Sequence, residues 1–240
     1  MHEKISIDKE CTNGYNKIMK LPAHIQGAIF DLDGTLLDSL HVWQDVDTRF
    51  FKKRGIPLPK DYLHIVKTME LFEAAIYTKT AFHLPETPEE LVSEWHEMVK
   101  EEYALRVEMK PYAKEFLEKL SQEGIKLGIA TSSAREIFLP CLKRHGVAHL
   151  FSALTETREA ARGKTFPDPY LLAAERLQIS PKHCAVFEDI LVGIKSAKAG
   201  GFYTVAVADP FSQADEILLK SEANLFIKSF ESLYYNKGDL

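Results

Sequence analysis

Short apolar runs recur along the chain and alternate with longer amphipathic stretches. The runs cover residues 26–30, 126–131, 150–154, 184–187 and 203–208, and a shorter run at 225–227 fits an edge strand. Runs this short, apolar at nearly every position, are typical of strands buried on both faces of a parallel sheet. The pattern therefore predicts a mainly parallel sheet.

The stretches between these runs have helical periodicity. Residues 114–123 place Phe116, Leu117 and Leu120 on one face, and Gly124 follows as a helix terminator. Residues 169–177 and 192–199 show similar patterns. Alternation of strands and helices from residue 111 onward predicts an α/β fold with a doubly wound, Rossmann-like parallel sheet.

Residues 39–108 break this alternation, because they contain helix formers, aromatic residues and charges but no convincing strand. Thr87, Pro88 and Glu90 form the sequence signature of a helix start with a capping box. We therefore predict an inserted α-helical cap domain at 39–108. The α/β core would comprise 24–38 and 109–240, and residues 1–23 would form an N-terminal extension.

Carboxylates follow two of the predicted strands. Asp31 and Asp33 come directly after the first strand, and Glu188 and Asp189 come directly after the run at 184–187. Ligands of open parallel sheets bind beyond the carboxyl ends of the strands, so we expect these acids to converge there. A plain Asp-Gly turn at Asp33 and Gly34 would explain only the first pair. Two pairs of carboxylates are typical of a Mg²⁺ site completed by water and phosphate oxygens.

Candidate phosphate ligands lie at two further places. The strand at 126–131 ends in the run Thr131-Ser132-Ser133, whose hydroxyls and main-chain N–H groups can hold phosphate oxygens, Thr131 and Ser132 being the candidate ligands. Lys164 precedes an amphipathic helix and can supply a compact positive charge. A P-loop is excluded, because Arg158 stands where that motif requires its first glycine.

The ordered set of these motifs resembles the haloacid dehalogenase superfamily, in particular its β-phosphoglucomutase-like subgroup. The resemblance spans about residues 25–226 and rests on the runs Asp31-Leu-Asp33-Gly-Thr, Thr131, Gly-Lys164-Thr-Phe-Pro-Asp and Phe-Glu188-Asp189. It implies phosphoryl transfer with Mg²⁺, since dehalogenases and phosphonatases of the family lack an acid at the position of Asp33.

The same resemblance implies a role for each site residue. Asp31 would be the nucleophile, and Asp33 the general acid and base that also offers its main-chain carbonyl to the metal. Asp189 would complete the Mg²⁺ site, with Glu188 either as a second ligand or as a partner that orients the ligands. The phosphoryl group would be held by Thr131, Ser132 and Lys164. The cap would close over a small phosphorylated metabolite and select it.

Three other interpretations remain open. A phosphomutase would need a cation in the cap, where residues 66–72 contain no arginine but do contain Lys67. A non-catalytic binding protein could share the fold. Cys141, His145 and His149 lie four residues apart, a spacing that fits zinc ligands on one helix, but we expect Pro140 and Gly146 to disrupt that helix.

Composition narrows the choice of partners and compartment. The 240 residues are 45% hydrophobic and 27% charged and carry a net charge of −5, which excludes a basic nucleic-acid-binding surface as the main theme. Three widely spaced cysteines favour reduced thiols over a disulfide framework. With no membrane span or signal peptide in the pattern, we expect a cytoplasmic monomer that binds neither membrane nor nucleic acid.

Overall fold

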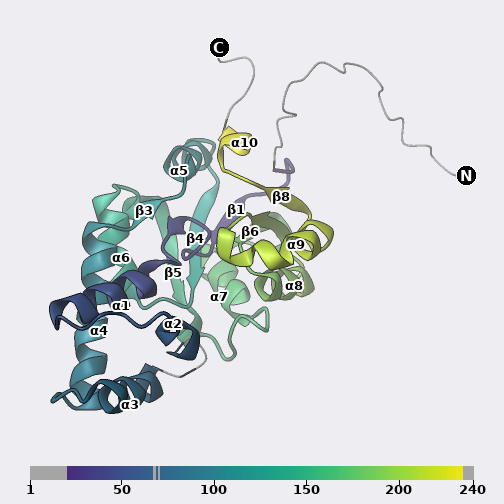
Figure 1. The fold of residues 1–240 in the computed structure, drawn as a ribbon. Helices are drawn as coiled ribbons and strands as arrows, with labels where there is room; N and C mark the ends of the chain where they lie inside the picture. The colour runs from purple at the N-terminus through teal and green to yellow at the C-terminus, as the bar shows by residue number, and fades with distance from the viewer. Residues whose placement is uncertain (1–20, 67–68, 70, 235–240) are drawn as a thin grey trace, which may run out of the picture.

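A six-stranded parallel sheet forms the centre of the molecule in the computed structural model, which describes residues 21–66, 69 and 71–234 (Figure 1). The strand order is β5-β4-β1-β6-β7-β8. The bounds are β1 Gly27–Phe30, β4 Lys126–Thr131, β5 Phe151–Glu156, β6 Cys184–Glu188, β7 Tyr203–Val207 and β8 Leu225–Ile227. All six predicted strands are therefore confirmed.

Strand β5 differs most from its predicted bounds, and β1, β6 and β7 each differ from theirs by one residue. The apolar run at 150–154 predicted a strand start at Leu150, but Leu150 closes the short 3-10 helix η1, Ala148–Leu150. Strand β5 instead continues through Thr155 and Glu156, both buried. Hydrophobicity alone missed these two positions because they are polar.

Helices cover both faces of the sheet, as the doubly wound prediction requires. Ile29 packs with Tyr170 and Ala173 of α7 (Asp168–Leu177), whereas its neighbour Phe30 packs with Phe116 of α5 (Ala113–Gln122). Successive strand residues point to opposite faces, so α5 and α7 lie on opposite sides of β1. The remaining helices of this region are α6 Arg135–Arg144, α8 Leu191–Ala199, α9 Glu216–Glu222 and α10 Glu231–Tyr234, with 3-10 helices η2 Thr157–Glu159, η3 Pro181–His183 and η4 Pro210–Asp215.

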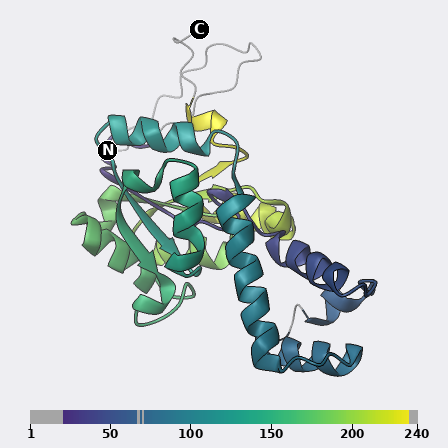
Figure 2. The same ribbon diagram turned by 90° about the vertical axis from the view of Figure 1, so that its left-hand side faces the viewer.

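Among the described residues, four helices lie between β2 (Leu37–Asp38) and β3 (Glu108–Met109) and form what we call the helical insertion, residues 42–105. They are α1 Val42–Lys53, α2 Tyr62–Val66, α3 Leu71–Phe82 and α4 Pro88–Leu105. At its base, β2 pairs antiparallel with β3. Figures 1 and 2 show α3 farthest from the sheet, while α4 runs back and packs against α6. An inserted helical segment is thus confirmed.

The exact domain boundaries at residues 38/39 and 108/109 stay a prediction. Most of the predicted N-terminal extension, residues 1–20, lies outside the described residues. Within the described part of the chain, no helix combines the length and the apolar character that a membrane crossing requires.

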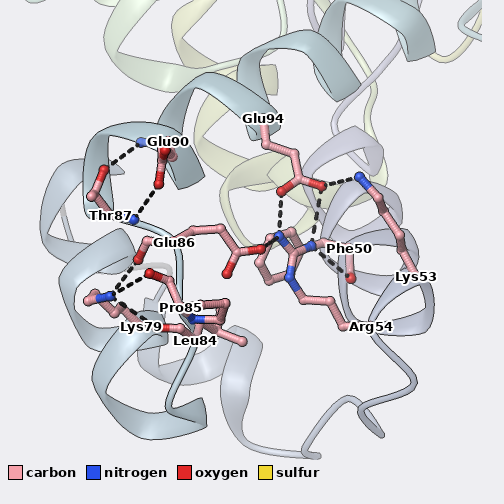
Figure 3. A network of polar contacts seen from close by, with 10 residues as sticks. All are labelled: Phe50, Lys53, Arg54, Lys79, Leu84, Pro85, Glu86, Thr87, Glu90 and Glu94. Atoms are coloured by element: carbon pink, nitrogen blue, oxygen red, sulfur yellow. Dashed lines mark hydrogen bonds and ion pairs between the residues drawn. The ribbon is translucent and has the colours of Figure 1, made fainter.

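A polar network fixes α1 against the start of α4 (Figure 3). The guanidinium of Arg54 pairs with Glu86 at 2.6 Å and with Glu94 at 2.5 Å, and it also lies over the ring of Phe50. Thr87 and Glu90 form the predicted capping box at the first turn of α4. The geometry of the helical insertion is therefore set by charge pairing as well as by packing.

Helix α6 corrects one expectation, that Pro140 would interrupt a helix at this place. The helix runs from Arg135 through Pro140 to Arg144, and Gly146 follows in the left-handed conformation that ends it. Pro140 and Glu136 are both exposed, so the carbonyl that a proline leaves unbonded can face water.

Candidate active site

The acidic residues predicted at two strand ends meet at one edge of the sheet. Strand β1 lies between β4 and β6. Strands β4 and β5 are added on one side of β1 and β6 to β8 on the other, so the strand order reverses here and creates a topological switch point. Asp31 follows β1, and Glu188 and Asp189 stand at the end of β6. One carboxylate oxygen from each of these three acids lies within 4.8 Å of the other two.

Lys164 reaches into this acidic group. Its Nζ lies 2.5 Å from Oδ1 of Asp31 and 2.6 Å from Oε1 of Glu188. Burial raises the pKa of Asp31 well above its usual range, Lys164 opposes this effect, and Glu188 adds to it. Burial acts to lower the pKa of Lys164, but Asp31 and Glu188 outweigh it and the pKa is raised. Lys164 is therefore a buried cation held by two carboxylates.

The group has more negative charge than Lys164 offsets. The carboxylate of Asp189 accepts from Thr35 Oγ1 at 3.0 Å and from Ser212 Oγ at 3.3 Å. Burial, followed by the charge of Glu188, raises the pKa of Asp189 to about 7. Three buried carboxylates beside one lysine require a further cation or bound protons.

A divalent cation fits this arrangement. Oε2 of Glu188 is fully buried and has no hydrogen-bond partner among the described residues, although its Oε1 accepts from Lys164 and from Tyr170 OH. A buried carboxylate oxygen is rarely left unpaired. Oxygen ligands from Asp31, Glu188 and Asp189 are the type that hard cations prefer.

Asp33 lies in a separate cluster of hydroxyl groups. Its Oδ1 accepts from Ser39 Oγ at 2.6 Å and from Tyr103 OH at 2.5 Å, and its Oδ2 accepts from Ser133 Oγ. The donors come from three places: the segment before α1, helix α4 and the loop after β4. Three converging donors fix the direction of this carboxylate and satisfy both of its oxygens.

The other predicted phosphate ligands differ in position. Thr131 is fully buried at the end of β4, where its Oγ1 accepts from the N–H of Ser133 at 3.1 Å. Ser132 is exposed and its hydroxyl lies 3.3 Å from Thr157 Oγ1, so it is not joined to the carboxylates. The next residue, Ser133, makes the contact with Asp33 instead.

None of the three hydroxyl contacts to Asp33 was predicted from the sequence. Ser133 belongs to the run Thr131-Ser132-Ser133, which indicated phosphate binding and not a contact with Asp33. Tyr103 carries no such signal, because it lies seventy positions from Asp33 and meets it only through the packing of α4.

The zinc interpretation is not supported. Sγ of Cys141 and Nε2 of His145 both face the main-chain carbonyl of Val107, at 3.6 and 2.9 Å. Among the described residues, the one group of three or more potential metal ligands is Asp31, Glu188 and Asp189.

Comparison with known proteins agrees with this geometry. The family profile described as haloacid dehalogenase-like hydrolase matches residues 28–207. The chain is 30% identical to validoxylamine A 7'-phosphate phosphatase of Streptomyces hygroscopicus subsp. limoneus, covering 80% of this chain and 92% of that protein. It is 29% identical to hexitol phosphatase A of Escherichia coli, covering 88% of this chain and 94% of that protein.

Solved structures give the same result. A Thermotoga maritima protein described as a candidate beta-phosphoglucomutase superposes with a TM-score of 0.77 at 27% identity, covering 90% of this chain and all of that one. The profile match covers well over half of the chain and includes the strand ends that carry Asp31 and Glu188 and the loop that carries Lys164. The chain therefore belongs to the haloacid dehalogenase-like hydrolases.

Proposed function

We propose that this phosphoric monoester hydrolase is a Mg²⁺-dependent phosphatase that acts on a small phosphorylated sugar or related metabolite, through an aspartyl-phosphate on Asp31. The observation that carries the proposal is the environment of Asp31. This buried carboxylate contacts a buried lysine at 2.5 Å, and it lies within reach of two further acids that can share a metal. The proposed nucleophile, cation and metal ligands thus lie together where β1 and β6 end.

The substrate class is inferred from the relatives. One relative is named for validoxylamine A 7'-phosphate and another for hexitols, and both align over most of their length. A further relative is named phosphorylated carbohydrates phosphatase. Their common chemistry is a phosphate ester on a small polyhydroxylated body.

In the first half-reaction, a carboxylate oxygen of Asp31 attacks phosphorus, and a new O–P bond forms as the ester O–P bond breaks. Asp33 gives its proton to the departing oxygen, which leaves as an alcohol. The positive charge of Lys164 stabilises the phosphoryl oxygens during transfer, as expected for a reaction that depends on positioning and electrostatics.

In the second half-reaction, Asp33 takes a proton from water, and the water oxygen attacks phosphorus. The bond to Asp31 breaks, inorganic phosphate leaves, and both aspartates return to their starting states. The hydroxyls of Ser39, Tyr103 and Ser133 hold the Asp33 carboxyl in one direction during both transfers. Asp33 thus serves as a positioned acid and base.

Asp31, Glu188 and Asp189 would hold the Mg²⁺, together with the main-chain carbonyl of Asp33. A bound Mg²⁺ would orient the phosphoryl oxygens and offset their charge. The unpartnered Oε2 of Glu188 supports this assignment. Thr131 and Lys164 would contact the phosphoryl group, whereas the exposed position of Ser132 favours its main chain over its hydroxyl for this role.

A phosphomutase is the second candidate, because the chain resembles a candidate beta-phosphoglucomutase at 27% identity. The two reactions share the first half-reaction and differ in whether water or a second sugar phosphate receives the phosphoryl group. Lys67, the cation that could grip a second phosphate, lies outside the described residues. Incubation with β-glucose 1-phosphate separates the two, since a mutase forms glucose 6-phosphate without releasing phosphate.

The proposal is tested by measuring phosphate release from a panel of hexose, hexitol and pentose phosphates with Mg²⁺, and again with EDTA. We expect Mg²⁺-dependent turnover that Asp31→Asn abolishes with folding intact. Asp38→Asn is the matched control, because Asp38 is an exposed acid seven positions along the same segment. Turnover that survives in Asp31→Asn, or phosphate binding with no turnover by the wild type, would contradict the proposal.

A further inference from the structure

The turn that follows β7 lies beside the proposed Mg²⁺ site. It runs from Asp209 to Ser212 and begins the 3-10 helix η4, and the hydroxyl of Ser212 donates to Oδ2 of Asp189 at 3.3 Å. Packing holds this turn only weakly, because Pro210 is exposed and Phe211 is 64% exposed. The position from which Ser212 donates therefore depends on polar contacts.

Asp209 makes these contacts within the turn. Its Oδ1 accepts from the N–H of Phe211 at 2.8 Å, and its main-chain carbonyl accepts from the N–H of Ser212 at 3.1 Å. The side chain of Asp209 is 2% exposed, so its charge needs partners within the protein. The orientation of this carboxylate thus determines where Phe211 and Ser212 lie.

Lys110 supplies the balancing charge from a distant part of the chain. It directly follows β3, where the chain returns from the helical insertion, and its side chain is 11% exposed. Its Nζ donates to Oδ2 of Asp209 at 2.7 Å and to the main-chain carbonyl of Ala208 at 2.9 Å. Lys110 therefore holds one oxygen of Asp209 while the turn holds the other, and such charge-assisted hydrogen bonds fix the geometry of the groups around them.

The carboxylate of Asp189 is confined on three sides. Thr35 donates to its Oδ1, and Ser212 donates to its Oδ2. On the third side lies Gly34, where a Cβ atom would stand 2.5 Å from Oδ2. The two hydroxyls occupy one lone pair of each oxygen and leave another for a cation. The direction in which Asp189 offers its oxygens therefore depends on where Ser212 lies.

We propose that Lys110 and Asp209 are positioning residues of this enzyme, which orient Asp189 toward Mg²⁺ by fixing the hydroxyl of Ser212. The inference rests on the proposed function, in which Asp189 holds the metal. Both residues act through Ser212, and neither takes part in the chemical step. Removing a group that orients a metal ligand typically weakens metal binding about 10–100-fold. Because Thr35 still donates to Asp189, we expect the lower end of this range, about tenfold.

The test measures the Mg²⁺ dissociation constant of the substrate-free enzyme from the rise of its Tm with Mg²⁺ concentration. Lys110→Met, Asp209→Asn and Ser212→Ala should each weaken Mg²⁺ binding about tenfold. The first two substitutions change the net charge in opposite directions. A long-range electrostatic effect alone would make Lys110→Met strengthen Mg²⁺ binding and Asp209→Asn weaken it. Weaker binding by both variants therefore indicates positioning.

A double-mutant cycle separates positioning from a general loss of stability. Once Ser212→Ala has removed the donor, adding Lys110→Met should weaken Mg²⁺ binding by less than about a further twofold. Lys114→Met and Asp215→Asn are the charge-matched controls, at exposed positions of the same two segments. Both controls should leave the Mg²⁺ dissociation constant unchanged.

Several results would overturn the inference. They are stronger Mg²⁺ binding by Lys110→Met, an unchanged dissociation constant in Asp209→Asn or Ser212→Ala, a full tenfold loss, roughly, that Lys110→Met adds to Ser212→Ala, or equal losses in the controls. The Tm of each variant without Mg²⁺ shows whether it folds. If Lys110→Met does not fold, the nearly isosteric Asp209→Asn replaces it in the cycle.

Failure of this inference can be told apart from failure of the proposed function. If the Tm of the wild type rises with Mg²⁺ and the variants show the same dissociation constant, only the positioning roles fail. If the Tm of the wild type does not respond to Mg²⁺, the proposed metal site fails as well.

Discussion

The hydroxyl of Tyr103 offers a direct way to perturb Asp33 without changing its charge. Tyr103 lies on α4 and is 6% exposed, and its OH donates to Oδ1 of Asp33 at 2.5 Å. Tyr103→Phe removes one oxygen atom and keeps the ring in its packing position. If Asp33 protonates the leaving group, Tyr103→Phe should lower kcat/KM most for substrates whose leaving group needs a proton to depart.

The expected size of the effect follows from the contacts of Asp33. A hydrogen bond to a charged group contributes about 1.5–3 kcal/mol. Because Oδ1 also accepts from Ser39, it keeps one donor in the variant, and we take the lower part of that range, about 1.5–2 kcal/mol. At about 1.4 kcal/mol for each factor of ten, kcat/KM should fall about 10–30-fold.

The assay compares two leaving groups. An alkyl alcohol leaves poorly and needs the proton from Asp33, whereas p-nitrophenolate leaves readily without it. For Tyr103→Phe, kcat/KM should therefore fall about 10–30-fold with glucitol 6-phosphate. With p-nitrophenyl phosphate it should fall less than about threefold. Because kcat/KM reports the steps up to leaving-group departure, slow hydrolysis of the phosphorylated enzyme does not mask the difference.

Tyr77→Phe is the control, since Tyr77 is a partly buried tyrosine of the helical insertion that stacks near Tyr62 and does not contact Asp33. This variant should leave kcat/KM unchanged for both substrates. Equal losses with the two substrates after Tyr103→Phe, or no loss with either, would refute the role assigned to Asp33.

Three further changes have defined outcomes. Lys164→Met should lower kcat by about 10²–10³-fold, the effect of losing one preorganised group that stabilises charge in the transition state. Adding Mg²⁺ should raise the Tm of this variant more than it raises the Tm of the wild type. Arg54→Leu should lower the free energy of unfolding, measured by urea denaturation, by about 2 kcal/mol, because it leaves the half-buried Glu94 without its main partner. Lys53→Ala, at an exposed position, should lower it by less than about 0.5 kcal/mol. Burial raises the pKa of Asp47 from 3.8 to about 7, so its contribution to stability is complete below pH 4 and is lost as pH rises to about 7. Asp47→Asn should therefore match the wild type near pH 4 and exceed it in unfolding free energy at pH 8, by at most about 4 kcal/mol; equal values at pH 8 would contradict this.

The sequence was most informative where one short segment carries the whole signal. Apolar runs that end in acids located β1 and β6, and with them Asp31, Glu188 and Asp189. The sheet then brings these residues together, because neighbouring parallel strands end at the same edge. Lys164 could be proposed for the same site from its motif.

Contacts that depend on helix packing could not be predicted in this way. Tyr103 reaches Asp33 only because α4 packs beside the core, and nothing in its neighbours along the chain marks it. Asp47 and Trp95 share a cavity although they lie on different helices, and short helical patterns give no rotation or spacing between helices. The sequence also could not separate Ser132 from Ser133, since the geometry of the loop decides which hydroxyl turns toward Asp33.

Trapping the phosphorylated enzyme tests the central claim most directly. The protein is mixed with glucitol 6-phosphate and Mg²⁺, quenched in acid within milliseconds, digested, and analysed by mass spectrometry. The account predicts one added phosphoryl group on the peptide that contains Asp31, lost on longer incubation and absent from Asp31→Asn. Turnover without any phosphorylated peptide, or a phosphoryl group on another residue, would contradict Asp31 as the nucleophile.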